Sequence, residues 1–214
     1  MKYYPVYLDL RDRPCLVIGG GGVAERKALS LLEAGAKVTI ISPTLTPTLQ
    51  ALSDSGKITH KQKSFDEKND LSGKFLVIAA TDSPQVNIVA AQACKKKHIL
   101  VNVVVPPEES SFIVPSVVRQ GELAIAVSTS GASPALAKKI RQELESRYGP
   151  EYAFFLDQLG AIRKRVLEEV GDEGKRSAIF QEIVGSEVLD LLTQGKTQEA
   201  ELRMMEIAGL KERA

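Results

Sequence analysis

Hydrophobic residues in the first half of the chain form short runs, separated by segments with apolar residues at helical spacing. Continuous apolar runs predict buried strands, and the helical spacing predicts amphipathic helices. Strands buried on both faces belong to a parallel sheet covered on both sides, so we predict an α/β fold. The predicted strands are residues 15–18, 38–41, 58–65, 75–80 and 100–105, and the predicted helices are residues 23–33, 48–53 and 84–96. In the predicted helix 84–96 we expect Val86, Val89, Ala90 and Ala93 to face inward.

The pattern changes after residue 110. Two largely apolar runs, residues 112–118 and 123–128, predict strands. The polar stretch 119–122 between them predicts the turn of an antiparallel β-hairpin. Ser133 followed by Pro134 predicts a helix start, because a hydroxyl caps the helix and proline suits its first position. Amphipathic spacing then predicts an all-helical C-terminal part, with helices at about 151–170, 174–193 with a break at Gly185, and 197–209.

Composition limits the classes of function. The chain is 43% hydrophobic and 26% charged with a formal net charge of +1, which is typical of a globular protein and unlike a nucleic-acid-binding surface. No apolar run is long enough to span a membrane. Cys15 and Cys94 are too few for a disulfide framework, and with the histidines they give no metal-ligand spacing. We therefore expect a cytoplasmic protein with no metal site and neither a nucleic-acid nor a membrane partner.

A glycine-rich turn follows the first predicted strand and opens the first predicted helix. It reads Gly19-Gly20-Gly21-Gly22-Val23-Ala24, in the form G-x-G-x-x-A. Gly19 permits the tight turn, Gly21 allows the backbone to approach phosphates, and the small Ala24 allows helix and strand to pack closely. The free N–H groups of the helix start attract an anion. This arrangement predicts a dinucleotide pyrophosphate site formed by Gly19, Gly21, Gly22, Val23 and Ala24.

Other polar residues stand where strands of the predicted sheet end. The second strand is followed by Ser42-Pro43-Thr44 and not by the acid that commonly holds the ribose, and no basic residue follows closely. Hydroxyl or backbone groups would bind the ribose here, and we favour NAD over NADP. Thr81 and Asp82 follow the fourth strand, at the edge where ligands of parallel sheets bind. Asn102 in the fifth strand is either a buried amide satisfied by backbone or a contact near the nicotinamide.

Several stretches together resemble the precorrin-2 dehydrogenase family, the N-terminal module of sirohaem synthase, which in some members is also a ferrochelatase. The stretches are residues 5–10, 19–27, 79–82, 102–104, 110–116 and 126–134. The resemblance implies a Rossmann-like NAD-binding domain at 1–112, a segment at 113–148 through which two subunits interlock, and a helical domain at 149–214. It therefore implies a homodimer.

The resemblance also implies a reaction. NAD accepts a hydride from precorrin-2, a tetrapyrrole carrying several carboxylates, and sirohydrochlorin results. Such a polyanion favours a site with hydroxyl or backbone donors. The candidate substrate-binding hydroxyls are those of Ser110, Ser111, Ser128, Thr129 and Ser130.

One position departs from the family pattern. After Asn-Val-Val the family commonly carries an aspartate, to which the resemblance assigns general-base work and a part in chelation, but this chain has Val105. Valine cannot take a proton, so Asp82, Glu108, Glu109 or water would accept it. We expect dehydrogenase activity without efficient iron insertion. Two alternatives are a redox-sensing module that binds NAD without turnover and a dedicated metal chelatase, against which the missing carboxylate argues.

Overall fold

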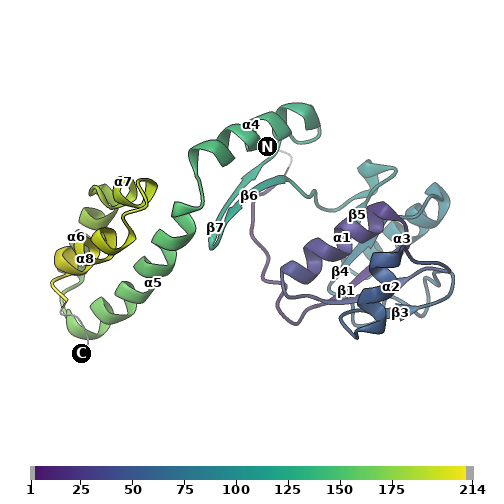
Figure 1. Cartoon of the computed structure of the whole chain (residues 1–214). Helices are drawn as coiled ribbons and strands as arrows, with labels where there is room; N and C mark the ends of the chain where they lie inside the picture. Colours follow the sequence, from purple (N-terminus) through teal and green to yellow (C-terminus); the bar gives the residue numbers. More distant parts are fainter. Residues whose placement is uncertain (1–2, 211–214) are drawn as a thin grey trace. The chain divides into compact units, whose positions relative to one another are not determined.

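The computed structural model describes residues 3–210, which divide into two compact units. Within the described residues the first unit ends at Val114 and the second begins at Pro115. Each unit has a hydrophobic core of its own. Figure 1 labels most elements of both units.

The first unit is built on a parallel sheet of five strands in the order β3-β2-β1-β4-β5. The strand β1 lies at the centre, with Val17 paired to Ile40 of β2 on one side and to Ile78 of β4 on the other. The chain therefore reverses its direction across the sheet beside β1, which is the point where open α/β sheets bind ligands. The strands are β1 (Pro14–Ile18), β2 (Lys37–Ile41), β3 (Thr59–Lys61), β4 (Leu76–Ala79) and β5 (Leu100–Val103).

Helices cover both faces of this sheet, as the continuous apolar strands predict. On one face, α1 (Gly22–Glu33) and α2 (Pro47–Asp54) pack Ala24, Ala28 and Leu49 against alternate strand residues such as Val17. On the other face, α3 (Pro84–Lys96) packs against the intervening strand residues. The prediction of an α/β fold with a doubly covered parallel sheet is confirmed.

Three predicted details of this unit are wrong, each for a local reason. The strand β3 is only three residues long, because it is an edge strand whose alternate residues face water. The strand β5 ends at Val103 and not at residue 105, two residues ahead of Pro106 and Pro107, which cannot donate to a ladder. In α3 Ala90 is buried and Val86 and Ala93 pack partly buried against the core, as predicted, whereas Val89 is 40% exposed. Asn87, Ala91 and Cys94 complete the inward face of this helix.

The second unit begins with an antiparallel hairpin of β6 (Ser116–Gln120) and β7 (Leu123–Val127). Its turn is the two residues Gly121 and Glu122, shorter than predicted, because the ladder extends to the pair Gln120–Leu123. Gly121 has φ of 57°, which suits a tight hairpin. The predicted strand at 112–118 starts later, at Ser116, because Pro115 cannot donate to a ladder.

Helices make up the rest of the second unit. Ser133 caps α4 (Pro134–Arg147) by accepting a hydrogen bond from the Leu136 N–H at 3.2 Å, as predicted. The following helices share one core, to which Phe155, Val166 and Met204 contribute, and α6 ends at Gly185. They are α5 (Glu151–Glu169), α6 (Glu173–Gly185), α7 (Val188–Thr193) and α8 (Thr197–Ala208). Over residues 3–210 no helix combines the length and the apolar character that crossing a membrane requires.

Candidate cofactor-binding site

The first two glycines of the turn after β1 are in close contact with neighbouring loops. Gly19 has φ of +121°, and a Cβ there would lie 2.4 Å from the carbonyl oxygen of Ala80, which follows β4. A Cβ on Gly20 would lie 1.9 Å from the carbonyl oxygen of Thr44 and 2.7 Å from the hydroxyl oxygen of Ser42. All three distances are far below a van der Waals contact. The absence of a side chain at these two positions lets three loops meet at the carboxyl edge of the sheet.

The next two glycines face open space. An added Cβ on Gly21 or Gly22 would meet no other atom within 4 Å. Gly21 is the N-cap of α1, and no side chain caps this helix start. The backbone N–H groups of the first turn are therefore available to an anion, with Val23 half-buried beside them and Ala24 fully buried against the sheet. This cradle fits the pyrophosphate of a dinucleotide.

The loop after β2 is the second part of the site. Ser42 is buried, and its carbonyl oxygen lies 2.9 Å from Nε2 of His60, whereas Pro43 and Thr44 are exposed. Thr46 fixes this loop to the glycine turn. Its backbone N–H donates to the carbonyl of Gly20 at 3.0 Å, and its hydroxyl donates to the Glu25 carboxylate. The loop reaches the turn without presenting a carboxylate where ribose acids commonly stand.

The loop after β4 is held by Asn87, a residue that the sequence analysis did not single out. The fully buried side chain of Asn87 accepts hydrogen bonds from the N–H and the hydroxyl of Thr81 at 3.2 and 2.7 Å. Its amide nitrogen donates to the carbonyl oxygens of Thr81 at 3.1 Å and of Val105 at 2.9 Å. One amide therefore connects the loop that contains Asp82 with the segment that contains Val105. In the sequence, Asn87 is one of several polar residues of this helix, such as Gln85 and Gln92, so the pattern gives it no distinct signal.

The polar residues on and after β5 have structural partners. The Asn102 amide nitrogen donates to the carbonyl of Phe112 at 3.1 Å. The Ser111 hydroxyl accepts from the Val101 N–H and the Ser110 hydroxyl from the Val103 N–H, each at 2.8 Å. These two hydroxyls therefore bind the outer edge of β5, which is a role that the sequence did not predict for them.

The candidate proton acceptors differ in their surroundings. Glu109, in the short 3₁₀ helix η1 (Pro107–Glu109), forms a 2.6 Å ion pair with Lys95. Glu108 in the same helix and Asp82 after β4 are exposed. Val105 is 52% exposed. Of these candidates, Asp82 lies next to Thr81, on the loop that contacts Gly19.

The remaining candidates lie in the second unit, in the loop between β7 and α4. The hydroxyl of Ser128 accepts from the N–H of Ser130 at 3.0 Å, and the hydroxyl of Thr129 accepts from the N–H of Ser133 at 3.0 Å. Ser130 has φ of 54° and is exposed, as is Ser128. These bonds give the loop a defined shape just ahead of the α4 N-terminus.

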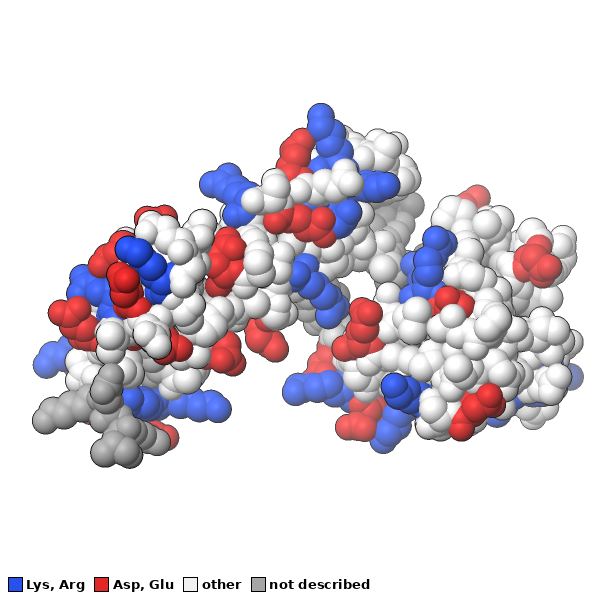
Figure 2. Space-filling model, viewed as in Figure 1, with Lys and Arg blue, Asp and Glu red and all other residues white. Residues whose placement is uncertain are grey.

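Charge and thiol chemistry are ordinary in the described part of the chain. Basic and acidic side chains are interspersed on the visible face of each unit, without a continuous patch of either sign (Figure 2). Burial raises the pKa of the Cys15 and Cys94 thiols to about 11, so both are unreactive at neutral pH. Among residues 3–210 no cluster of three or more His, Cys, Asp or Glu side chains could hold a metal ion.

Comparison with known proteins agrees with this site. Residues 6–116 match a family model described as putative NAD(P)-binding, and residues 120–147 match one described as sirohaem biosynthesis protein, central. The first match covers more than half of the chain. The chain belongs to the family of sirohaem synthase N-terminal modules.

Similar proteins extend the match over both units. Siroheme synthase of Photobacterium profundum is 36% identical over 207 residues, which are 97% of this chain and 44% of that protein. Siroheme synthase of Methylobacillus flagellatus is 40% identical over 195 residues, 88% of this chain and 41% of that protein. The chain thus spans less than half the length of these relatives. The solved structure of SirC, precorrin-2 dehydrogenase, is 29% identical with a TM-score of 0.80, and the match covers 95% of this chain and all of that one.

Proposed function

We propose that this chain is an NAD-dependent dehydrogenase that oxidises precorrin-2 to sirohydrochlorin in sirohaem biosynthesis. The observation that carries the proposal is the similarity to SirC, because it extends over the whole of that chain and includes both units. The cradle at Gly21 and Gly22 supports the same cofactor class, since its open backbone N–H groups suit a pyrophosphate. When bound, NAD+ supplies the acceptor for the hydride, and the substrate loses a proton as well.

In this proposal the residues of the first unit bind and orient the cofactor. The N–H groups of Gly22, Val23 and Ala24 hold the pyrophosphate, with Gly19 fixing the turn beneath them. Exposed Pro43 and Thr44 bind the ribose through hydroxyl or backbone groups. Thr81 follows the carboxyl end of β4, and Asn102 lies on β5. These two strands form the half of the sheet that receives the nicotinamide in dinucleotide-binding folds.

The proton that leaves the substrate needs an acceptor, and we propose Asp82. Its loop is tied through Asn87 to the segment with Val105, the position where the family commonly has an aspartate, and this connection supports the assignment. Glu109 is engaged by Lys95, which leaves Glu108 as the competing candidate. Replacing Asp82 by Asn would lower kcat by about a hundredfold with NAD+ affinity unchanged, while Glu108→Gln would leave kcat intact. The opposite pattern would assign the proton to Glu108.

Substrate binding in the second unit is assigned to the loop of Ser128, Thr129 and Ser130, whose hydroxyl and N–H groups suit a carboxylate. Ser110 and Ser111 also remain candidates in the first unit, although both hydroxyls already bind β5. We further propose that the protein acts as a cytoplasmic homodimer through residues 113–148. A mass of twice the 23.2 kDa chain in light scattering would support the dimer, and a monomer at all concentrations would contradict it.

The activity is tested by incubating the protein with precorrin-2 and NAD+ and following NADH together with the tetrapyrrole spectrum. We expect stoichiometric formation of NADH and sirohydrochlorin. Tight binding of NAD+ without turnover would instead favour the redox-sensing module, for which the missing acid at position 105 is the supporting observation.

Iron insertion is tested separately. With Val105 in place of a carboxylate, we expect the chain to insert Fe²⁺ into sirohydrochlorin no faster than the uncatalysed reaction, and Val105→Asp to gain activity. Because Val105 is half exposed, the substitution disturbs little packing. Efficient chelation by the natural chain would show that the position is not required.

A further inference from the structure

Lys27 is a half-buried cation of the first unit that the proposed cofactor contacts do not use. It lies in the second turn of α1, between the buried residues Ala24 and Leu31 of the face that packs on the sheet. Residues three and four positions apart are neighbours on a helix, so the aliphatic stem of Lys27 borders this buried face. Within residues 3–210 no carboxylate forms an ion pair with its ammonium group. The amine is therefore partly removed from water without a counter-charge.

This position is unfavourable for a charged group. Burial lowers the pKa of the Lys27 ammonium below its ordinary value, and the charge of Arg26 lowers it further. The direction of the shift means that the surroundings disfavour the charged form. A leucine or methionine would cover the same apolar surface without this cost. Packing alone therefore does not account for a lysine at this position.

A contact of Glu25 shows which flank of α1 carries Lys27. Glu25 accepts a hydrogen bond from the hydroxyl of Thr46, which lies in the loop after β2. Two residues along an α-helix are separated by about 200° of rotation, so Lys27 lies on the opposite flank of α1. The helix packs against β1 and β2, and the strand order is β2-β1-β4-β5. The flank with Lys27 therefore faces the half of the sheet formed by β4 and β5.

The helix also directs Lys27 toward the carboxyl edge of the sheet. Side chains on a helix tilt toward its N-terminus, which for Lys27 is the turn that contains Val23. Across this flank, Asn102 of β5 belongs to the same face of the sheet as α1, because it pairs with Ile78, and Ile78 shares a core with Ala24. A cation and an amide thus border the half of the site that we assign to the nicotinamide.

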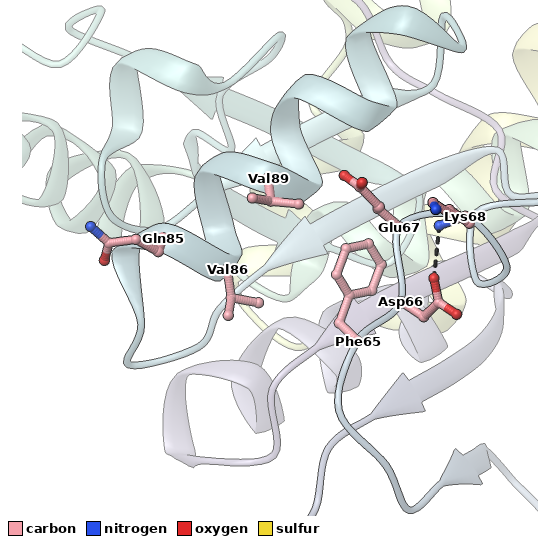
Figure 3. A pocket seen from close by; sticks show the side chains of 7 residues that line it. All are labelled: Phe65, Asp66, Glu67, Lys68, Gln85, Val86 and Val89. Atoms are coloured by element: carbon pink, nitrogen blue, oxygen red, sulfur yellow. Dashed lines mark hydrogen bonds between the residues drawn. The ribbon is translucent and has the colours of Figure 1, made fainter.

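The cavity on the other face of the sheet is unsuited to a polyanion. It has a volume of about 550 Å³ and lies between the loop after β3 and the start of α3 (Figure 3). The carboxylates of Asp66 and Glu67 line it, and Lys68 is the one basic residue of its wall. Excess negative charge repels a substrate with several carboxylates. Charge therefore favours the α1 face over this cavity for the tetrapyrrole.

We propose that Lys27 binds a carboxylate of the tetrapyrrole and positions the macrocycle beside the nicotinamide, an assignment that rests on the dehydrogenase activity proposed above. A half-buried ammonium donates to a carboxylate in a charge-assisted hydrogen bond, which is stronger than a bond between neutral groups. The substrate thereby supplies the counter-charge that the described part of the chain does not. Because this bond is present before and after hydride transfer, Lys27 is a positioning residue that affects substrate affinity more than the chemical step.

The test compares Lys27→Met with Arg26→Met. Both variants remove one positive charge from neighbouring positions of α1, but Arg26 is exposed and points away from the sheet. Methionine keeps an unbranched apolar stem and a high helix propensity. We expect Lys27→Met to raise KM for precorrin-2 and the Kd of sirohydrochlorin by about tenfold, with kcat and the Kd of NAD+ unchanged. Arg26→Met should leave all four quantities within about twofold, and Lys27→Arg should restore most of the affinity.

The outcomes separate this assignment from the proposed function. If the natural chain neither oxidises precorrin-2 nor binds sirohydrochlorin, the proposed function fails and the assignment fails with it. If the natural chain does both and Lys27→Met behaves like Arg26→Met, only the assignment to Lys27 is wrong. Weaker NAD+ binding by Lys27→Met would place the ammonium on the cofactor and would also overturn the assignment.

Urea denaturation gives a second readout. Because the half-buried charge is unfavourable, the unfolding midpoint of Lys27→Met should equal or exceed that of the natural chain. A lower midpoint would show that Lys27 supports the fold, and the loss of substrate affinity would then not count as evidence for a direct contact.

Discussion

The glycine turn after β1 consists of two pairs of glycines, 19–20 and 21–22, that have different roles although their residues are identical. Gly19 and Gly20 are pressed against the loops after β4 and β2, with no room for a methyl group. Gly21 and Gly22 face open space, and nothing in the described fold would prevent a side chain there. The first pair therefore serves the folding of the sheet edge, and the second pair serves a ligand. A run of four glycines in a sequence does not distinguish these roles.

The largest expected effect on stability comes from a substitution in the first pair of glycines, Gly19 and Gly20, which we call the packed half. Gly20→Ala would place a methyl group 1.9 Å from the Thr44 carbonyl oxygen, so two loops would have to separate. We expect the free energy of unfolding to fall by about 3 kcal/mol, measured by urea denaturation. An alanine at position 20 that left stability unchanged would break the distinction between the halves.

The open half is tested by Gly21→Ala. The added methyl group meets no protein atom, so the free energy of unfolding should change by less than about 1 kcal/mol. It would occupy the approach of the pyrophosphate, and we expect NAD+ to bind about tenfold more weakly, equivalent to about 1.4 kcal/mol. Loss of stability without loss of affinity would reverse the roles of the two pairs.

Thr46 sharpens the comparison, because it holds the packed half through hydrogen bonds. Thr46→Ala removes the cap of α2, which accepts the Leu49 N–H at 3.3 Å, and the bond to Glu25. We expect a loss of about 1 kcal/mol in thermal or urea unfolding and a smaller loss of NAD+ affinity than Gly21→Ala causes. Thr48→Ala, at an exposed position of the same helix, is the control and should be neutral.

The smallest effect on stability is expected from replacing Asp70, whose ion pairs with Lys63 and Lys61 hold the loop after β3. Burial raises the pKa of Asp70, but the hydrogen bond and charge of Lys63, the Asp66 N–H and Lys61 together lower it below its ordinary value. Its contribution to stability is therefore complete above the unfolded pKa of about 3.8 and is lost as the pH falls through the lower folded pKa. The free energies of unfolding of the natural chain and of the Asp70→Asn variant, measured as a function of pH, should therefore become equal at low pH. Asp54→Asn provides the matched comparison, and an equal pH dependence for both variants would refute the role of Asp70.

Sequence pattern predicted the sheet better than it predicted the surroundings of the site. Predominantly apolar runs identify β1, β2 and β4, because strands buried on both faces contain few polar residues. The bounds of α3 also follow from its capping Ser83, its proline and its apolar spacing.

The features that pattern missed depend on contacts between distant segments. Asn87 faces inward because Thr81 and Val105 supply its hydrogen bonds, and no helical periodicity contains that information. Val89, two positions further along the helix, is 40% exposed. The close approach of Gly20 to Thr44 likewise arises only when β1 and β2 pair. The prediction of an NAD-binding site depends on a local motif, the glycine turn, and is therefore independent of these contacts between distant segments.

The serine pair after η1 has a consequence for how copies of this protein can meet. With β5 at the end of the sheet, its outer N–H groups would be open to a strand from another molecule. Ser110 and Ser111 already bind the N–H groups of Val103 and Val101, and the Ser111 N–H donates to the Val101 carbonyl at 2.8 Å. The chain thus completes its own sheet with side-chain hydroxyls, and self-association through a shared sheet across β5 would first have to break these bonds.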